Sequence, residues 1–332
     1  MESEGYPVFA YGLKRIYAFQ AARSYPRFIS YLRRERVDVV HAYLFAAQMY
    51  GVPAARLAGV PLVIAGRRAI GVYWTAPRYR MVRRLTNSLC HLHVGNSLAV
   101  KEFIMREEGV PEEKIRIVYN GIDVNRFSPR EAGGGSRPPT VGYVGNLTQV
   151  KRVDLLLRAA RRILPEFPEL RVLIAGEGPG EARRSYEGAT DMNIRGLTRE
   201  LGLGARVVFM GRRERVEEDM RQMDIFVMPS QSEGMSNATL EAMGVGLPVI
   251  ATASGGNCEV VVHGRTGYLF PPGDEARLAE LMSELLRDAV ARRAMGRAGR
   301  ERVLERFTLK GMVTAMERVY REGLEGRGGC AL

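Results

Sequence analysis

Residues 230–252 read SQSEGMSNATLEAMGVGLPVIAT, and they follow a short apolar run, residues 224–228, that is typical of a buried strand. The stretch predicts a loop that carries Glu233 and then a helix over residues 237–244 that carries Glu241. A strand, a loop and a helix in this order form the repeating unit of an open α/β sheet, in which ligands bind beyond the carboxyl ends of the strands. We therefore expect both carboxylates at a ligand-binding edge.

The segment between the two carboxylates predicts a phosphate site. Gly234, Met235 and Ser236 place backbone N–H groups at the start of the helix, where these groups and the helix dipole favour an anion. Carboxylates accept hydrogen bonds from hydroxyl groups. Two carboxylates that flank a phosphate site indicate a ligand with hydroxyls at both ends and phosphate between them, a description that fits a nucleotide sugar.

Short apolar strands alternate with helices along most of the chain, which predicts parallel sheets covered on both faces. In the second half, the expected strands are residues 140–144, 171–175, 206–210, 224–228 and 248–251, with a helix at 150–164. In the first half, the expected strands are 37–41, 61–65, 91–94 and 115–119, and the expected helices are 26–36, 44–58, 77–89 and 97–108. The last stretch, residues 274–323, is expected to be helical throughout.

A segment rich in glycine, proline and serine separates the two series. Residues 128–140 read SPREAGGGSRPPT, and the apolar periodicity stops there. A chain of 332 residues is also long enough for two domains. We expect a first domain at 1–127, a linker at 128–139, a second domain at 140–307, and a C-terminal helix and tail at 308–332 that can pack back on the first domain.

The net positive charge of the chain is concentrated in its first half. Residues 1–139 hold 21 Lys/Arg against 11 Asp/Glu, a balance of +10, whereas residues 140–332 hold 28 against 26, a balance of +2. A basic surface attracts anions such as lipid headgroups, so an anionic membrane is one expected partner and a merely solvated Arg-rich surface is the alternative. Nucleic acid is not expected, because no recognition motif accompanies the charge.

The expected cellular location rests on two features that the sequence lacks. No apolar run has the length of a membrane span, and no secretory segment opens the chain. We expect a cytoplasmic protein, either free or held peripherally at the inner face of the membrane. Cys90, Cys258 and Cys330 are far apart and lack metal-ligand spacing, which favours ordinary reduced thiols.

Three glycine-containing turns follow expected strands. In residues 142–152, GYVGNLTQVKR, Gly145 lets a phosphate approach the backbone and Lys151 supplies a charge, although a plain turn with an exposed lysine is the alternative. Residues 176–180, GEGPG, lack dinucleotide-binding spacing and predict a structural turn. Residues 254–259, SGGNCE, fit either a ligand-approaching turn or a plain one, with Glu259 as a charge at a helix end.

Metal and acyl-transfer chemistry have no support in the sequence. The chain contains no D-x-D motif and no His/Cys cluster with metal spacing, so no metal or cofactor is expected. His41 ends an expected strand and is the histidine that we place near a cleft. His91 and His93 are expected to pack in or beside a strand.

Together these motifs resemble the retaining family 4 glycosyltransferases, which have the GT-B fold. The family's E-x7-E pair is matched by Glu233 and Glu241. Its other segments, V-G-x-L-x-x-x-K, N-G-[IV]-D, G-G-x-x-E-[VI]-V and T-G-x-L-x-x-P-G-D, are matched at residues 144–151, 120–123, 255–261 and 266–274. The resemblance is specific over about residues 110–275 and looser over 27–110.

The resemblance implies an α/β fold of GT-B architecture, with two doubly wound, Rossmann-like domains facing a cleft. The second domain would hold the nucleotide-sugar donor, and the first the acceptor. Glu241 would bind the ribose hydroxyls and Glu233 the donor sugar, with Glu233 and Lys151 as the catalytic residues. The diphosphate would lie near Gly145, Asn146 and Lys151 and on the backbone of residues 234–237, with no metal required.

The chain departs from the family pattern at three places. Asn146 stands where the family usually has arginine, which removes one charge from the diphosphate site. Gly66, Arg67 and Arg68 stand where many members have a histidine, so Arg67 or Arg68 is expected to face an anion on the acceptor side, beside His41. The usual opening strand with its glycine-rich turn is expected to be missing from the first domain.

Three functions fit these observations. The first is sugar transfer, with retention, from a UDP- or GDP-sugar to a glycan or lipid-linked acceptor in cell-surface polysaccharide or glycolipid synthesis. The second is an inactive nucleotide-sugar-binding module, motivated by the missing strand. The third is a nucleotide-sugar epimerase on the same fold. The sequence leaves the base, the sugar and the acceptor open.

Overall fold

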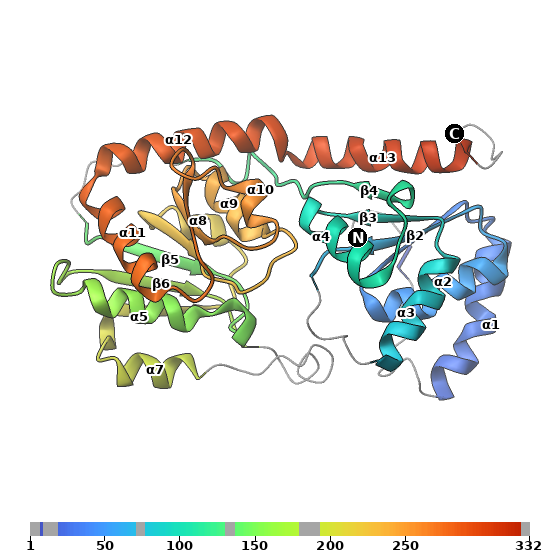
Figure 1. Ribbon diagram of the computed structural model, residues 1–332, viewed down its shortest axis with the longest axis horizontal. Helices are drawn as coiled ribbons and strands as arrows, with labels where there is room; N and C mark the ends of the chain where they lie inside the picture. Colours follow the sequence, from blue (N-terminus) through green and yellow to red (C-terminus); the bar gives the residue numbers. More distant parts are fainter. Residues whose placement is uncertain (1–6, 9–18, 71–76, 130–136, 179–192, 327–332) are drawn as a thin grey trace.

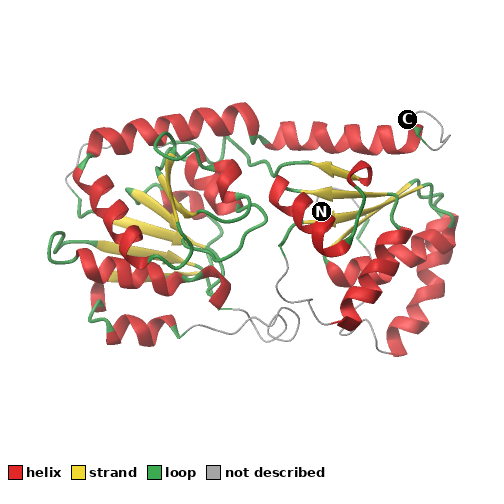
Figure 2. Ribbon diagram, viewed as in Figure 1, coloured by secondary structure: helices red, strands yellow, loops and turns green. Residues whose placement is uncertain are grey.

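The computed structural model describes residues 7–8, 19–70, 77–129, 137–178 and 193–326 as two α/β domains that lie side by side. Of the last two helices, Ala289–Arg306 runs along the second domain and Leu309–Glu325 along the first (Figure 1). Helices cover both faces of each sheet (Figure 2). The expected pair of parallel, doubly wound sheets is confirmed. The expectation of a missing opening strand stays a prediction, since residues 1–6 and 9–18 lie outside the described part of the chain.

The first sheet contains four parallel strands in the order β1-β2-β3-β4. Its strands are β1 (Val39–Tyr43), β2 (Leu62–Arg67), β3 (Leu92–Gly95) and β4 (Ile115–Ile117). Its helices are α1 (Phe19–Arg34), α2 (Phe45–Ala58), α3 (Pro77–Leu89), α4 (Leu98–Glu108) and a 3₁₀ turn, η2 (Glu112–Lys114). Ser97 caps α4, because its hydroxyl accepts a hydrogen bond from the N–H of Val100.

Strand β2 shows why this sheet is buried on both faces. Val63 and Ala65 pack with α1 and α2 on one side, whereas Leu62 and Ile64 pack on the other side against the C-terminal helix α13 (Leu309–Glu325). Successive side chains of a strand point to opposite faces, so a strand between two helical layers has to be apolar throughout.

The second sheet has six parallel strands in the order β10-β9-β8-β5-β6-β7. They are β5 (Thr140–Val144), β6 (Arg171–Ala175), β7 (Val207–Gly211), β8 (Ile225–Met228), β9 (Val249–Thr252) and β10 (Gly267–Phe270), of which β10 was not expected. The helices and 3₁₀ turns before α13 are η3 (Gln149–Lys151), α5 (Val153–Ile163), α7 (Ile194–Glu200), η4 (Gly204–Arg206), α8 (Val216–Met220), α9 (Asn237–Gly244), α10 (Asn257–Val260), α11 (Glu275–Arg287) and α12 (Ala289–Arg306).

The C-terminal stretch that was expected to be one helical region is divided into α11, α12 and α13. The carboxylate of Asp288 accepts hydrogen bonds from the N–H groups of Val290 and Ala291, and so starts α12. Phe307 then leaves the helical conformation, and the Thr308 hydroxyl caps α13 at the N–H of Gly311. Each break therefore has a side chain that satisfies the first amides of the next helix.

The chain passes between the domains twice, first through residues 118–129, the crossing segment, and again through residues 307–308 between α12 and α13. The two crossings lie side by side. The N–H of Ile122 donates to the Phe307 carbonyl, and the N–H of Leu309 donates to the Ile122 carbonyl, both at 2.9 Å. Ile122 and Phe127 belong to the core of the second domain. The first crossing thus comes before residue 127, where we expected the first domain to end, because these two apolar side chains are buried against α9. The middle of the expected linker, residues 130–136, lies outside the described ranges.

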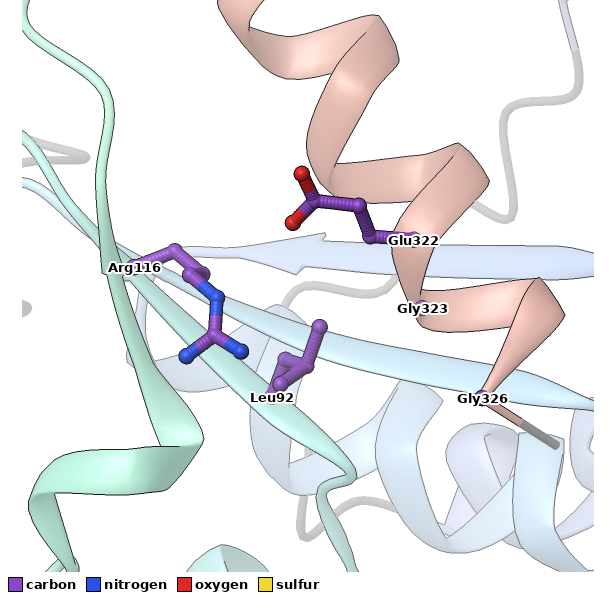
Figure 3. A pocket seen from close by; sticks show the side chains of 5 residues that line it. All are labelled: Leu92, Arg116, Glu322, Gly323 and Gly326. Atoms are coloured by element: carbon purple, nitrogen blue, oxygen red, sulfur yellow. The ribbon is translucent and has the colours of Figure 1, made fainter.

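Helix α13 covers the outer face of the first sheet. Its Val319 and Leu324 pack with Leu62 and Ile64, and Gly323 lies directly over Leu62. At its end, α13 leaves a cavity of about 150 Å³ on the sheet, into which Figure 3 shows side chains of both elements projecting; the lining residues are Leu92, Arg116, Glu322, Gly323 and Gly326. Among the described residues, no helix is long and apolar enough to cross a membrane.

Candidate active site

The carboxyl ends of β5 and β8 mark the point where the second sheet reverses its strand order. Strand β5 pairs with β6 on one side and with β8 on the other, so the chain leaves these neighbouring strands in different directions. In open α/β sheets this is where a crevice forms and ligands bind. The loops that carry Gly145 and Glu233 both begin here, as the sequence predicted.

The turn after β5 needs glycine. Gly145 has φ 151°, in a region that side chains disfavour, and a Cβ there would lie 2.6 Å from the Tyr143 hydroxyl oxygen. That hydroxyl donates to the carbonyl of Asn146 at 2.9 Å, which fixes the turn. Burial, together with the nearby Glu233 carboxylate, raises the pKa of Tyr143 well above its usual value, so the group stays a neutral donor.

Lys151 and Glu233 are brought together, and they form an ion pair. Lys151 lies in the 3₁₀ turn after β5, and a hydrogen bond of 2.8 Å from the N–H of Gln231 to the carbonyl of Val150 joins the two loops. The Lys151 side chain is 26% exposed and that of Glu233 is 10% exposed. A phosphate bound at this edge could therefore replace Glu233 as the partner of Lys151.

The start of α9 lies directly beside Glu233. Ser236 caps the helix by accepting a hydrogen bond from the N–H of Thr239 at 3.2 Å, and the Met235 side chain is buried in the core. Asn237 accepts a hydrogen bond of 2.8 Å from the side chain of Asn120 in the crossing segment. The backbone of residues 234–237 thus forms the predicted helix start.

Glu241 lies further along α9, is half-buried, and is close to the Glu217 carboxylate. Burial, with a smaller contribution from Glu217, raises the pKa of Glu241 to about 7, although the nearby Arg126 opposes the shift. A carboxylate that is costly to ionise in the free protein gains more from hydroxyl donors than an exposed one does. Glu241 is therefore suited to bind a pair of hydroxyl groups.

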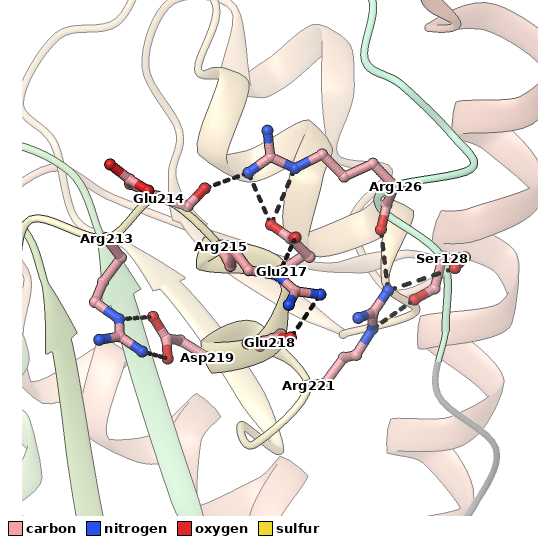
Figure 4. A network of polar contacts seen from close by, with 9 residues as sticks. All are labelled: Arg126, Ser128, Arg213, Glu214, Arg215, Glu217, Glu218, Asp219 and Arg221. Atoms are coloured by element: carbon pink, nitrogen blue, oxygen red, sulfur yellow. Dashed lines mark hydrogen bonds and ion pairs between the residues drawn. The ribbon is translucent and has the colours of Figure 1, made fainter.

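Sequence reasoning missed Arg126 and Glu217, which surround Glu241. Figure 4 shows Arg126 extending from the crossing segment to Glu217 of α8, whose Oε2 accepts from Nε at 3.0 Å and from Nη2 at 2.9 Å. Arg221 of the same region donates to the Ser128 carbonyl, so both ends of residues 126–128 are held on the second domain. A single arginine after the N-G-I-D motif gives no spacing signal, and this pairing becomes visible only in three dimensions.

The first domain closes over the donor loop. The space around Gly234 is occupied by the backbone carbonyl of Arg68, which a Cβ on Gly234 would overlap. The Arg68 side chain is exposed, and its guanidinium lies over the Tyr43 ring at 5.2 Å. Arg68 is therefore the residue of the pair that remains available to an anion in the cleft.

The expectation for Arg67 has to be corrected. Arg67 is buried, forms an ion pair with Glu108, and donates to the Gln48 side chain at 3.0 Å and to that of Asn87 at 3.3 Å. Neighbouring residues of a strand point to opposite faces, and the alternation sends Arg67 into the helical layer of the first domain. It has no anion-facing role in the cleft.

His41 is held inside the first domain, one face of its ring against Tyr43. Its Nδ1 lies 2.9 Å from the Tyr320 hydroxyl of α13, and the rings of His41 and Tyr43 stack at 4.1 Å. Burial, with a smaller effect of Arg68, lowers the pKa of His41 to about 4, so the ring is neutral at pH 7. His91 and His93 lie beside and in β3, as expected, and both are buried.

The described residues contain no group of three or more His, Cys, Asp or Glu side chains that could hold a metal ion. The metal-independent chemistry that we expected from the sequence remains a prediction.

Two family models match this chain, one for each domain. The model of the glycosyl transferases group 1 matches residues 125–302, and that of glycosyltransferase family 4 matches residues 5–126. The first therefore covers more than half of the chain, and it includes Lys151, Glu233 and Glu241.

Named relatives match this chain over most of its length. A sulfoquinovosyl transferase of Arabidopsis thaliana is 28% identical over 300 residues, 83% of this chain and 55% of the plant protein. A UDP-Gal:alpha-D-GlcNAc-diphosphoundecaprenol alpha-1,3-galactosyltransferase of Escherichia coli is 26% identical over 310 residues, 87% of this chain and 76% of that protein. This chain thus spans about half the length of the plant relative.

Solved structures confirm the fold. Anabaena Alr3699/HepE in complex with UDP has a TM-score of 0.76 at 22% sequence identity, over 92% of this chain and 83% of that chain. The expected GT-B architecture, two Rossmann-like domains that face a cleft, is therefore shown.

Proposed function

Because the chain belongs to the glycosyl transferases group 1 family, we propose that it transfers a sugar from a nucleoside diphosphate sugar to an acceptor hydroxyl. One observation carries this proposal most strongly. The Lys151–Glu233 ion pair precedes the start of α9 and the half-buried Glu241 follows it, at the reversal point of the second sheet. The order of these groups matches the order of sugar, diphosphate and ribose in such a donor.

Each group has a distinct role in binding the donor. Glu241 accepts hydrogen bonds from the ribose hydroxyls, and Glu233 accepts them from the donor sugar. Lys151, Gly145, Asn146 and the backbone of residues 234–237 bind the diphosphate, whose negative charge replaces Glu233 as the partner of Lys151.

The same groups support the chemical step. The bond between the anomeric carbon and the diphosphate oxygen breaks, the acceptor oxygen bonds to that carbon, and the acceptor proton passes to the leaving phosphate. Lys151 and the amides at the start of α9 stabilise the charge that develops on the phosphate. We propose that the acceptor attacks on the face that the phosphate leaves, which retains the anomeric configuration and requires no metal.

The relatives and the acceptor side of the cleft support a proposal for the donor and acceptor classes. HepE was solved with UDP, and the E. coli relative is named for a UDP-sugar and a diphosphoundecaprenol acceptor. We propose a UDP- or GDP-sugar as the donor, and a glycan or lipid-linked acceptor in cell-surface polysaccharide or glycolipid synthesis. We propose that the exposed Arg68 binds an acceptor phosphate.

A lipid-linked acceptor would bring this protein to a membrane surface. Helix α3 exposes Met81, Val82 and Leu85 beside the exposed Arg84, and most of the net positive charge, +10 of +12, belongs to residues 1–139. We propose that this face contacts anionic lipids. The fraction of protein that sediments with vesicles of about 30% phosphatidylserine should decrease as the salt concentration increases. Salt-independent binding would contradict an electrostatic attachment.

Thermal unfolding with a panel of nucleotides tests the proposed function. UDP or GDP, and at least one of their sugars at millimolar concentration, should raise the melting temperature through binding to the folded state alone. Mass spectrometry of the same mixtures then detects slow release of the free sugar. No stabilisation by any nucleotide would overturn the proposal, stabilisation without turnover over a range of acceptors would indicate a binding module, and an isomerised sugar nucleotide would indicate an epimerase.

A further inference from the structure

We propose that Glu259 is a positioning residue that holds the two domains in the closed arrangement needed for transfer. It belongs to the second domain, on the short helix α10, yet its carboxylate binds the first domain. Leu98 donates its N–H to Oε2 at 2.9 Å, and Ala99 donates its N–H to Oε1 at 3.0 Å. One carboxylate of the donor domain thus caps a helix of the acceptor domain.

The contact is chemically well matched. The first amides of a helix have no partner inside the helix, and the helix dipole gives this end a partial positive charge. In α4, Ser97 satisfies the amide of Val100, and Glu259 satisfies the two amides before it. Tyr119, which follows β4, lies close enough to Glu259 that the carboxylate, after burial, helps to raise the pKa of the Tyr119 hydroxyl. Hydrogen bonds to an ionised group are stronger than neutral ones.

On its own domain, Glu259 is fixed from behind. Arg302 of α12 donates to the backbone carbonyl of Glu259 at 2.7 Å and to that of Val260 at 2.9 Å. Through α12, this anchors α10 to the rest of the second domain. The carboxylate is therefore presented to the first domain by a rigid support rather than by a free loop.

The anchored turn also supports the catalytic loop. The N–H of Gly256 donates to the Glu233 carbonyl at 3.1 Å, and side chains at Gly255 and Gly256 would overlap the carbonyls of Glu233 and Gly234. A displacement of α10 would therefore move the backbone that carries Glu233. The contact with α4 and the position of Glu233 are mechanically joined.

On the acceptor side, the capped helix start brings a polar side chain to the same loop. Asn96 directly precedes Ser97, is 4% exposed, and its Oδ1 is without a hydrogen-bond partner among the described residues. A Cβ on Gly234 would lie 3.1 Å from that oxygen. Closure through Glu259 thus places the unpartnered Oδ1 of Asn96 against the residue that follows Glu233, where this oxygen could accept a hydrogen bond from a sugar hydroxyl.

Hydrogen exchange gives the most direct test, because helix-start amides are ordinarily unprotected. In the full chain without ligand, the amides of Leu98 and Ala99 should exchange slowly, and Glu259→Ala should accelerate both by about tenfold or more. Glu301→Ala, which removes an exposed carboxylate of the same domain, should leave both rates unchanged. Unprotected amides in the wild-type chain, or equal rates in Glu259→Ala, would overturn the proposal.

The same contact can be broken from the acceptor side. Leu98→Pro removes one of the two donors at the first helical position, where proline is favoured, and the extended Ser97 before it is compatible with proline. Leu98→Ala keeps the N–H and serves as the matched control. Small-angle X-ray scattering should give a larger radius of gyration for Leu98→Pro and for Glu259→Ala than for the wild type and both controls. An unchanged radius in both variants would contradict the role in closure.

An activity measurement separates positioning from donor binding, and this part rests on the proposed function. With UDP-glucose as the probe, Glu259→Ala should lower kcat for sugar release about tenfold and leave the KM and the affinity for UDP within about twofold. A raised KM with unchanged kcat would overturn the positioning role. If the wild type released no sugar, the proposed function would fail, while the exchange and scattering results would still decide the closure.

Discussion

The two domains each contain an ion pair between a basic residue at or after the end of a strand and a carboxylate, and the two pairs serve opposite purposes. Arg67 and Glu108 in the first domain have side chains 9% and 3% exposed; Arg67 also donates to Gln48 and Asn87, and Glu108 also accepts from Arg83. Lys151 and Glu233 in the second domain are 26% and 10% exposed and lie at the reversal point of the sheet.

The difference shows that pairing alone does not identify a functional site. The Arg67–Glu108 pair is enclosed by a helical layer, and burial lowers the pKa of Arg67 to about 10, an indication of how fully it has lost water. Such a pair is closed to a ligand, and the removal of one partner leaves an uncompensated buried charge. The Lys151–Glu233 pair is open to a ligand that carries both hydroxyls and phosphate.

Removal of the Glu108 charge should have the largest effect on stability. Glu108→Gln leaves two guanidinium groups, Arg67 and Arg83, without their buried anion, and we expect a loss of about 3–5 kcal/mol in the free energy of unfolding of the first domain. Urea unfolding followed by circular dichroism measures the loss. The exposed neighbour variant Glu107→Gln should change it by less than about 0.5 kcal/mol; equal effects would show that the buried pair is not structural.

Removal of the Lys151 charge should act on the reaction instead. Lys151→Met keeps much of the side-chain volume, and we expect kcat/KM for the donor to fall about 100- to 1000-fold, through lost stabilisation of the leaving phosphate. The urea midpoint should move far less than in Glu108→Gln. A stability loss as large as that of Glu108→Gln, with activity retained, would place both pairs in the structural class.

The affinity for the nucleotide should depend on pH through Glu241. The pKa of Glu241 is about 7 in the free protein because burial disfavours the charged form. Ribose hydroxyls donate to the ionised carboxylate and lower its pKa in the complex, so binding releases a proton, and affinity falls by up to about tenfold for each pH unit below 7. Calorimetric titration of UDP from pH 8 to pH 5.5 measures this slope.

Glu241→Gln is the control for that titration, because UDP itself gains a proton in the same range. The variant should show only the pH dependence of the ligand. Identical slopes in the wild type and the variant would refute the ribose role of Glu241.

The smallest effect is expected at Arg126. Its positive charge opposes the rise in the pKa of Glu241, so Arg126→Gln should move the midpoint of the pH-dependent UDP affinity to a higher pH. The affinity at pH 8.5 should change little, because Arg126 binds Glu217 rather than the nucleotide. A midpoint that moves to lower pH would have the wrong sign for this account.

Sequence patterns predicted the parts of the fold that depend on local signals. The strand at Thr140–Val144 and the helix at Asn237–Gly244 have the expected bounds, because alternation of apolar runs with capped helices fixes them within a few residues. Strand β10 was missed because Gly267–Phe270 is a four-residue run that begins with a glycine at φ 149°, which gives no strand signal.

The contacts between the domains could not be predicted in this way. Glu259 was read only as a charge at a helix end, but the helix it caps lies about 160 residues earlier in the chain. Arg67 and Arg68 were treated as equivalents, although one residue along a strand decides between the core and the cleft. The contact of Arg126 with Glu217 depends on the path of the crossing segment, which no local sequence pattern predicts.

The central claim is that the second domain binds a nucleoside diphosphate sugar between Glu233 and Glu241. Calorimetric titration of UDP and of GDP into the wild-type chain and into Glu241→Ala at pH 8 tests it most directly. The account predicts that at least one nucleotide binds the wild type and that Glu241→Ala weakens that binding about tenfold or more. Equal affinity in the two proteins, or no binding of either nucleotide to the wild type, would contradict it.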